Sequence, residues 1–558
     1  MAKRRFIENI KERLAKEVGT VYKPHAGRLR FALAFPNSYY VGMSNLGLQT
    51  VYRILNERED SVCERVFLPD PSDADELLRT GDRLVTMESQ TPVRDFDVLA
   101  FSVSYELDYA NVLRILRLSG IEESAAERGP ADPLVIAGGP TATFNPEVLA
   151  PFVDAFVIGE AEEVLPEVVD LLAEGCAGDR EELLLKLAHV DGVYAPRFYE
   201  PEYNDDGTIR RVRATHGVPE TVRRCWLPRL ESHAAASVIL TPETEFSNMI
   251  LAEVARGCGR KCRFCVAGYT YLPPRAGSPD GVLDAIRRAE ERFAKSSGSR
   301  PRIGLISASI FDHPSSMLIC QSLAERDRLF SISSTRADTL NRDIAQILRR
   351  GGQETLTIAP EAGSYRLRCA IGKGMTDEDL ISAAAAAWDG GFRRLKLYFM
   401  VGLPTETPDD VVGIVNLVSR IASMFEWTRL TVSLSCFVPK PWTPFQWAAM
   451  AGEKELAGKV NGLRNALRSL SRVEVVGESA REAVAQGVLS RGDRRLRDAL
   501  LLASRENVNW RTAFKLGGVA PAFYAQRARN RDEVFPWDHV STGVPKEFLW
   551  REYENAVR

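Results

Sequence analysis

The sequence predicts an α/β fold: a doubly wound, Rossmann-like domain, then a partial (β/α)6 TIM barrel, then a helical C-terminal region. Three observations predict it. Short apolar runs alternate with amphipathic stretches from residue 28, the alternation stops near residue 190, and it resumes at residue 249. Continuous apolar strands separated by helices are typical of parallel sheets covered on both faces. The chain has 558 residues, too many for a single hydrophobic core.

The doubly wound domain is expected over residues 28–189, after a helical extension over residues 1–27. Its apolar runs end in glycine and proline, notably at Gly138-Gly139-Pro140 and at Gly159. Ligands bind at this edge of doubly wound sheets, although tight turns alone also require such residues. The predicted strands cover residues 28–35, 63–69, 97–104, 133–140 and 154–160.

A β-hairpin connector is expected over residues 190–248, because the turn Asn204-Asp205-Asp206-Gly207 separates two short strand-like pieces. Six βα repeats follow over residues 249–445. They fall short of the roughly eight repeats of a full barrel, so a partial barrel is predicted, with its chemistry at the carboxyl ends of the strands. Residues 446–558 are expected to be mainly helical. The predicted barrel strands cover residues 250–255, 302–309, 329–335, 354–360, 394–402 and 430–439.

Composition and charge narrow the class of protein. Hydrophobic residues make up 45% and charged residues 26% of the chain, as in ordinary globular proteins. No uncharged apolar run reaches the ~18–20 residues that span a bilayer, and residues 1–18 lack the apolar core of a secretory signal. The formal net charge of -3 gives no general attraction to nucleic acid or acidic membranes. A cytoplasmic protein without a membrane partner is therefore expected.

The nine cysteines are unevenly distributed. Cys258, Cys262 and Cys265 fall in one short loop directly after the first predicted barrel strand. Nine cysteines in a chain of this length do not make a disulfide framework. Most of the others are expected to be buried small apolar side chains; they are Cys63, Cys176, Cys225, Cys320, Cys369 and Cys436.

The cysteine loop suits an iron–sulfur cluster. A cubane cluster normally takes four thiolates, so three would leave one iron open to an external ligand. Four cations between residues 256 and 263 would offset the cluster charge and lower the thiol pKa values. A structural zinc site is the main alternative. It needs a fourth Cys or His at short spacing, and the next candidate is the distant His313.

The pattern Cys-x3-Cys-x2-Cys, with the aromatic Phe264 before the third cysteine and a partial barrel behind it, resembles the radical S-adenosylmethionine superfamily. The resemblance covers residues 249–444. It implies a 4Fe-4S cluster on Cys258, Cys262 and Cys265, whose open iron chelates the methionyl amine and carboxylate of S-adenosylmethionine. It further implies reductive cleavage to methionine and a 5′-deoxyadenosyl radical, and a one-electron reductant such as flavodoxin or ferredoxin. The resemblance names no further catalytic residue.

The resemblance also assigns cosubstrate-binding positions. The backbone of Phe264 corresponds to the position that meets the adenine, and Ser309 lies where the family has a Gly-Gly-Glu motif that this chain lacks. Ser334 and Arg336 follow the third barrel strand, where polar groups serve the ribose and carboxylate. Glu361 lies in a stretch, APEAGSYRLR, similar to a Glu-Ser-Gly-type turn. A helix cap or solvated loop is the competing interpretation for each polar residue, and for Glu361 a carboxylate at a helix N-terminus.

Two further strand ends complete this set. Val401 and Gly402 lie in FMVGLPTET, which resembles the fifth-strand motif that lines the adenine, and Lys440 is expected to face the site from the sixth. Near the C-terminus, Trp537 and His539 are expected either to cover the barrel mouth or to form a buried structural pair, the second being favoured.

The N-terminal domain resembles the cobalamin-binding domain that precedes the barrel in one large radical class. Its turns at residues 138–147 and 159–163 are typical of that class. Base-off cobalamin binding uses an Asp-x-His-x-x-Gly segment, and no histidine occurs between His25 and His189. Either cobalamin binds without a protein imidazole, or the domain only shapes the substrate cavity, which we favour slightly. The whole arrangement, including residues 527–549, resembles an uncharacterised bacterial radical family often fused to a further C-terminal domain.

Three functions are compatible with these features. The first is radical C–H functionalisation of an unknown substrate. The second is a cobalamin-dependent radical methyltransferase, and the third is a non-catalytic cluster- or corrinoid-binding sensor. A modest basic excess near the C-terminus allows an RNA substrate, although a solvated helix face is the more common meaning of such arginines. These are Arg491, Arg494, Arg495, Arg497, Arg527, Arg529 and Arg531.

Overall fold

The N-terminal domain is built on a six-stranded sheet. The structure, a computed structural model, describes residues 2–175, 178–231, 235–294, 300–505 and 508–558. The strand order is β2-β1-β3-β4-β5-β6, parallel except for the antiparallel β6. The order reverses between β1 and β3, so a crevice is expected at their carboxyl ends. The strands are β1 (Leu29–Phe35), β2 (Ser61–Phe67), β3 (Val98–Ser102), β4 (Leu134–Gly138), β5 (Ala155–Val157) and β6 (Val193–Tyr194).

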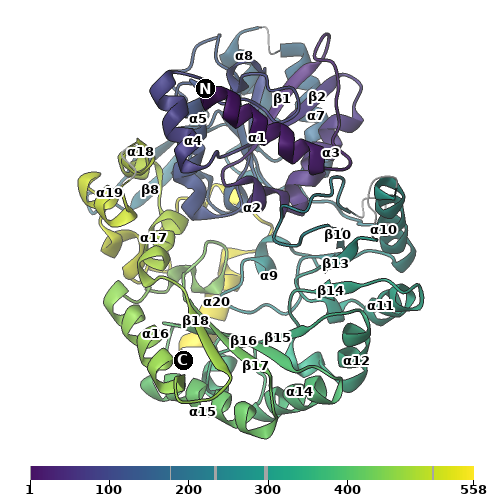
Figure 1. Cartoon of the computed structure of the whole chain (residues 1–558). Coiled ribbons are helices and arrows are strands. Elements are labelled where there is room, and N and C mark those ends of the chain that lie inside the picture. The colour runs from purple at the N-terminus through teal and green to yellow at the C-terminus, as the bar shows by residue number, and fades with distance from the viewer. Residues whose placement is uncertain (1, 176–177, 232–234, 295–299, 506–507) are drawn as a thin grey trace.

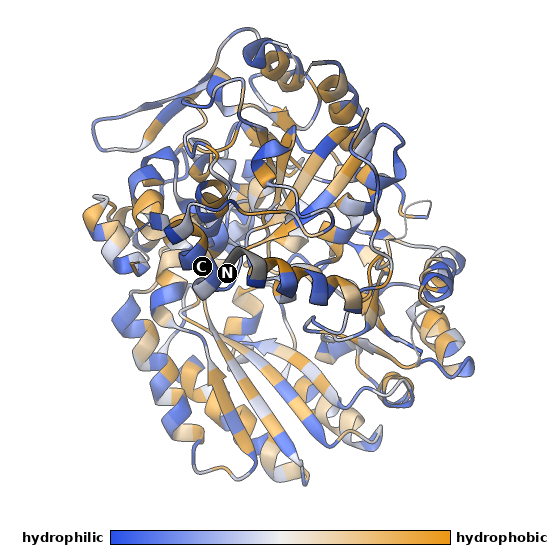
Figure 2. Cartoon of the chain, turned by 45° about the horizontal axis from the view of Figure 1, so that its top comes forward, coloured by the Kyte–Doolittle hydropathy of each residue, from blue (hydrophilic) through white to orange (hydrophobic). Residues whose placement is uncertain are grey.

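Burial explains why these strands are apolar throughout. All seven residues of β2 are buried, and β1 has a single partly exposed position. Parallel strands need helical crossovers, which cover both faces of the sheet. In Figure 2 the strands of this sheet are mostly orange, the colour of hydrophobic residues. The main helices are α1 (Ala2–Lys16), α3 (Leu46–Glu57), α4 (Pro71–Thr80), α5 (Tyr109–Ser119), α7 (Ala161–Gly175) and α8 (Arg180–Ala188), with the short α2 (Tyr39–Met43) and α6 (Pro140–Phe144).

The barrel is open and parallel, which confirms the predicted fold class. Its strands form two sheets, β10-β13-β14 and β15-β16-β17-β18, joined by a parallel bridge between Thr335 and Ile358. The last strand was not predicted; its alternating half-buried and exposed residues belong to an edge strand and make no apolar run. The strands are β10 (Met249–Glu253), β13 (Arg302–Ile306), β14 (Phe330–Ile332), β15 (Thr355–Glu361), β16 (Arg394–Val401), β17 (Arg429–Cys436) and β18 (Val473–Gly477).

Helices separate the barrel strands on the outside, and their starts are encoded locally. Thr376 and Asp379 form a capping box at one of them, and Thr407 with Asp410 at another. The buried residues of β16 alternate with half-exposed ones, because helices cover one face only. The helices are α10 (Pro279–Phe293), α11 (Ser316–Glu325), α12 (Arg342–Arg350), α13 (Tyr365–Ala370), α14 (Asp377–Asp389), α15 (Pro408–Met424) and α16 (Glu453–Leu467).

The remaining segments tie the two domains together. The predicted hairpin is present as β7 (Tyr199–Tyr203) and β8 (Ile209–Ala214). The C-terminal region carries α17 (Ala480–Arg491), α18 (Arg497–Arg505), α19 (Trp510–Leu516) and α20 (Lys546–Val557), and α18 packs against α5. Figure 1 shows α17–α19 along one side of both domains and α20 near the centre of the molecule. Two short pairs complete the structure: β9 (Val222–Arg223) with β19 (Val540–Ser541), and β11 (Ala255–Arg256) with β12 (Arg275–Ala276).

Within the described ranges, every helix is too short or too polar to cross a lipid bilayer. Of the scattered cysteines, Cys63, Cys320 and Cys436 are buried as expected, Cys225 is half-buried and Cys369 is exposed. Cys176 lies outside the described residues.

Candidate functional site

The cysteine loop runs from β11 to the short helix α9 (Ala267–Thr270), at the carboxyl end of the first barrel strand. Cys258, Cys262 and Cys265 are free and half-buried. The backbone N–H of Cys265 donates to the Cys262 carbonyl at 3.0 Å, which forms a tight turn. At Gly257 φ is +80°, and a Cβ there would lie 2.3 Å from the Tyr271 carbonyl oxygen. Only glycine therefore fits at the start of the loop.

Burial and charge act in opposite directions on the thiols. Burial raises the pKa of Cys262 and that of Cys265, the latter to about 11. The nearby charges of Lys373 and Arg336 work against the rise in the pKa of Cys262. Thiols in such a place ionise readily only when a cation or metal takes the charge.

The donor set fits an iron–sulfur cluster with one open iron. Three thiols come from one short loop, and the cations Arg336 and Lys373 lie beside it. Across the described ranges, no group of three or more His, Cys, Asp or Glu side chains is arranged to hold one metal ion. A cubane cluster does not require its thiolates to converge on one metal ion, because each thiolate binds a separate iron.

Two of the predicted cosubstrate residues lie around Cys262. Arg336 and Glu361 are among the charges that act on its thiol. Arg336 is held by Asp338 through hydrogen bonds of 2.9 and 2.8 Å, and Glu361 accepts a hydrogen bond of 2.8 Å from Lys373. The structure thus assembles two ion pairs beside the loop. Lys373 was missed by the sequence analysis, and only its place between Gly372 and Gly374 marks it as unusual.

The other predicted positions are engaged in different ways. Phe264 packs into a small apolar cluster that includes Ile371, Phe437 and Phe445. Val401 is fully buried in the main core. The Gly402 N–H, at φ +81°, donates to the Glu406 carboxylate at 3.0 Å.

Three polar positions predicted from the sequence are bound within the protein or lie in its loops. The Ser309 N–H donates to the Ser307 hydroxyl at 3.3 Å. Ser334 is half-buried and precedes Thr335, the residue that bridges β14 to β15. Lys440 forms an ion pair with the buried Glu106 of the N-terminal domain, so its ammonium group links the two domains. The cosubstrate roles of all these positions stay predictions.

A cavity of about 560 Å³ lies between the two domains. One wall is the carboxyl edge of the N-terminal sheet, with Ser102, Gly138 and Gly159 at the ends of β3, β4 and β5. The other wall includes Gly257 of the cysteine loop and Ser307 after β13. Its exposed surface is mainly apolar, and no histidine is among the described residues that line it. Figure 1 shows α9, which follows the cysteine loop, between the domains.

An ion cluster borders this cavity. Glu160 accepts two hydrogen bonds from Arg275, at 2.8 and 2.7 Å, and one of 2.7 Å from Arg256. Arg256 also binds Glu162 and Glu253, at 2.7 and 2.8 Å. Burial alone would raise the pKa of Glu160, but the hydrogen bonds from Arg275 and the charge of Arg256 outweigh it and hold that pKa below its usual value. The cluster joins the β5–α7 turn to the residues just before Cys258.

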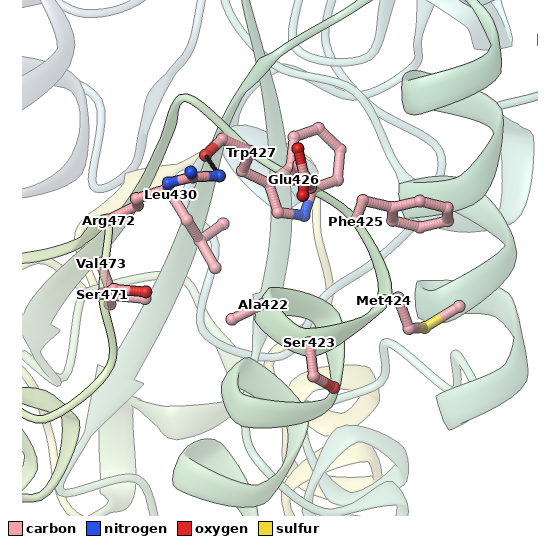
Figure 3. A pocket seen from close by; sticks show the side chains of 10 residues that line it. All are labelled: Ala422, Ser423, Met424, Phe425, Glu426, Trp427, Leu430, Ser471, Arg472 and Val473. Carbon is pink, nitrogen blue, oxygen red and sulfur yellow. Dashed lines mark hydrogen bonds between the residues drawn. The ribbon is translucent and has the colours of Figure 1, made fainter.

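A second cavity, of about 340 Å³, lies far from the cysteines. It is formed at the amino ends of β17 and β18, where Arg472 donates to the Trp427 carbonyl at 3.4 Å (Figure 3). The chemistry of such barrels is located at the carboxyl ends of the strands. We therefore exclude it from the candidate site.

The C-terminal arginines do not form an open basic surface. Arg491 and Arg529 are buried. The others have carboxylate partners: Arg494 binds Glu147, Arg495 Asp493, Arg497 Asp498, Arg527 Glu533 and Arg531 Glu547. These contacts give the expectation of an RNA substrate no support, and it stays a prediction.

Two family models match the chain. The model described as "Radical SAM proteins, N-terminal" matches residues 47–196. The model described as "Radical SAM superfamily" matches residues 252–418, from β10 to α15, and so includes the cysteine loop.

Individual relatives cover different parts of the chain. An uncharacterised protein of Methanocaldococcus jannaschii is 29% identical over 469 residues, 83% of this chain and 89% of that protein. An uncharacterised methyltransferase of Pyrococcus horikoshii is 24% identical over 302 residues, and the match covers 51% of this chain but only 58% of the relative. The solved structure of the cobalamin-dependent S-adenosylmethionine radical enzyme OxsB shares the fold, with a TM-score of 0.50 at 14% identity over 86% of this chain and 62% of that one.

Proposed function

The chain belongs to the radical S-adenosylmethionine superfamily, and from that premise we propose that Cys258, Cys262 and Cys265 hold a 4Fe-4S cluster that serves C–H functionalisation of a substrate. When bound, the cluster would supply the electron that breaks the S–C5′ bond of S-adenosylmethionine. Enzymes of this family need an electron donor, and we propose a flavodoxin or ferredoxin.

The charged residues beside the loop suit a zwitterionic cosubstrate. Glu361 and Arg336 carry opposite charges and both act on Cys262. A carboxylate orients an ammonium group and a guanidinium binds a carboxylate. We therefore assign Glu361 to the methionyl amine and Arg336 to the methionyl carboxylate, with Lys373 and Asp338 as the groups that hold them.

The observation that carries the proposal is the position of the cysteine loop. Gly257 and Arg256, directly before Cys258, line the cavity whose opposite wall is the edge of the N-terminal sheet. A ligand in this cavity would therefore stand next to the proposed cluster. Ligand sites of ~300–1,000 Å³ with apolar walls and few polar groups are typical of small-molecule and cofactor binding.

The first test concerns the cluster. Anaerobic reconstitution should give ~four irons per chain, and dithionite with S-adenosylmethionine should give 5′-deoxyadenosine. Cys262→Ala should lose the product entirely, because an iron would lack its thiolate, whereas Cys225→Ala, a cysteine outside the loop, should retain it. Chromatography of the nucleoside products measures both. A wild-type protein that binds only zinc, or that is fully loaded and makes no product with candidate substrates, would contradict the proposal; the second result would favour a sensor.

A second candidate function, cobalamin-dependent methyl transfer, is favoured by the same cavity. Its apolar walls and glycine-rich strand ends suit a corrinoid. Ser102, Gly138 and Gly159 would lie against it. When bound, a corrinoid would supply a methyl group, and S-adenosylhomocysteine would then accumulate.

The corrinoid prediction can be checked by gel filtration with hydroxocobalamin and visible absorption. Ser102→Phe should weaken binding at least ~tenfold, about 1.4 kcal/mol, because the ring would fill the cavity. Ser423→Phe places the same side chain in the cavity of Figure 3 and should leave binding unchanged. If the wild-type chain retains no corrinoid, methyl transfer is excluded while the radical proposal stands.

A further inference from the structure

Helix α20 touches the cysteine loop from nearly 300 residues further along the chain. Lys261 lies over the ring of Phe548, with its Nζ 5.3 Å from the ring centroid. Arg263 forms an ion pair with Glu552, at 3.1 Å from Nε and 3.0 Å from Nη2. Each contact reaches a residue that lies between two of the three cysteines.

The third contact is apolar. Phe264 packs into the cluster that contains Ala556 and Tyr553 of α20. Phe548, Glu552 and Ala556 are spaced four residues apart, so they lie on one face of the helix. That face therefore meets the residues between the cysteines through a ring and a carboxylate, and its Ala556 belongs to the cluster against which Phe264 packs.

The helix itself is firmly held. Trp447 is fully buried, and its ring packs against Trp550 and Tyr553 of α20 at centroid distances of 5.1 and 6.0 Å. Leu549 is also fully buried. The helix is thus fixed to the barrel by one side and meets the loop with another.

The loop is held by contacts of its own and by the barrel: the Tyr269 hydroxyl donates to the Lys261 carbonyl at 2.9 Å, and Arg260 donates to Asp312 at 2.8 Å. Lys261 adopts the left-handed region at φ +54°, which is strained for a residue with a side chain. Arg263 is also bound to the barrel, since its N–H donates to the Ile371 carbonyl at 2.9 Å and its Nη1 to the Ala370 carbonyl at 2.8 Å. The ion pair with Glu552 therefore completes a set of contacts that orient the segment between Cys262 and Cys265.

We propose that α20 is a clamp that fixes the cysteine loop in the conformation that receives the cluster, with Glu552 and Phe548 as its positioning residues. The inference rests on the proposed function for the identity of the cluster, but the clamp acts on the loop whether or not a cluster is bound. Glu552 touches the residue between two cysteines and has no direct role toward the cosubstrate.

The experiment compares three disrupting variants with one control and one conservative variant in the full chain. Glu552→Gln removes the charge, Glu552→Lys places a like charge against Arg263, and Phe548→Leu removes the ring beneath Lys261. The control is Glu547→Lys, because Glu547 lies on the same helix, is 70% exposed and binds Arg531 at 2.7 Å instead of the loop. Phe548→Tyr, which retains the ring face, should restore the wild-type behaviour.

Two readouts separate the clamp from the cluster. In the iron-free, reduced protein, iodoacetamide alkylation of Cys262 relative to Cys225 is followed by mass spectrometry. In the reconstituted protein, iron release to a ferrous chelator is timed. Loss of a partly buried ion pair, about 1 kcal/mol, corresponds to roughly fivefold faster alkylation and iron release in Glu552→Gln, and Glu552→Lys should be faster still.

Equal rates in Glu552→Gln, Phe548→Leu and Glu547→Lys would overturn the clamp. If Glu552→Lys does not fold, Glu552→Gln carries the same comparison, because it has nearly the same shape. If wild-type protein takes up no iron, the proposed function fails, and the alkylation rates still decide whether α20 holds the loop.

Discussion

His539 is a buried imidazole where the C-terminal region meets the N-terminal domain. Its ring packs against those of Tyr194 and Tyr199, at centroid distances of 4.7 and 5.7 Å, and its Nε2 lies 3.7 Å from a Glu147 oxygen. Burial lowers the pKa of His539 to about 4, although the charge of Glu147 opposes the shift. Trp537 is buried too and donates to Gln446 at 3.1 Å. Both side chains are thus buried, as the favoured expectation requires, and their pairing with each other stays a prediction.

This burial predicts a loss of stability in mild acid. The unfolded chain protonates His539 near pH 6.5 and the folded chain only near pH 4, so the unfolded state gains protons first as the pH falls. Between pH 7 and pH 5 the free energy of unfolding should fall by about 2 kcal/mol through this residue. His539→Gln should remove that part of the decrease, which urea denaturation at the two pH values measures.

The effect of His539 must be measured as the difference between the wild-type protein and His539→Gln, because another buried group also titrates in this pH range. Burial raises the pKa of Asp108 to about 6, so that group favours the folded state as the pH falls, which is the opposite sign. Asp108 is present in both proteins and cancels in their difference. Identical pH profiles for wild type and His539→Gln would contradict the assignment.

At the scale of elements, the turn after β15 is constrained by its neighbour α15. A Cβ on Gly363 would lie 2.2 Å from the Asp410 carbonyl oxygen and 2.3 Å from the Ile414 nitrogen. Two backbone segments meet there with no space for a side chain. The glycine in APEAGSYRLR is thus required by packing, in the turn that directly follows Glu361, the last residue of β15.

Gly363→Ala should therefore destabilise the barrel by about 1–3 kcal/mol, as overpacking in a tight core does. The control is Gly374→Ala, an exposed glycine after α13 whose Cβ would meet nothing within 4 Å. Thermal unfolding monitored by circular dichroism compares the two. A Gly363→Ala protein as stable as Gly374→Ala would show that the helix can move away.

Elements with a local signal could be predicted from the sequence. The runs at residues 394–402 and 430–439 correspond to β16 and β17, because four buried residues alternate regularly along each strand. The strand β18 lies at the edge of the sheet, where it pairs with β17. Its side chains are alternately exposed and half-buried, so its sequence has no apolar run that would predict a strand. Short strands such as β6 could not be predicted either, because two residues are too few to show a periodic pattern.

At the scale of the whole molecule, the domains are joined by buried charge. Glu160 belongs to the N-terminal domain, while Arg256 and Arg275 belong to the barrel, and Arg224 of the connector lies 3.5 Å from the same carboxylate. Glu160 is 5% exposed. Removing the shared carboxylate would take this partner from the buried guanidinium groups of Arg224 and Arg275, whereas Arg256 would keep Glu162 and Glu253.

Glu160→Ala should lower the free energy of unfolding by about 3–5 kcal/mol, the usual cost of breaking a buried ion pair from one side. The control, Glu163→Ala, removes an exposed carboxylate of the same turn and should change the free energy of unfolding by less than about 0.5 kcal/mol. Urea denaturation of both variants measures the difference. Equal stabilities would mean that water or Glu162 compensates the arginines.

The sequence by itself determined the alternation of strands and helices, the fold class and the cysteine loop that marks the family. Each of these depends on residues close together in the chain, whose periodicity and spacing are visible without a structure. Only the tertiary structure decided that Lys373 joins Glu361 beside Cys262, that α20 holds the cysteine loop, and that a cavity lies between the domains. These features depend on contacts between residues far apart in the sequence, which no local pattern encodes.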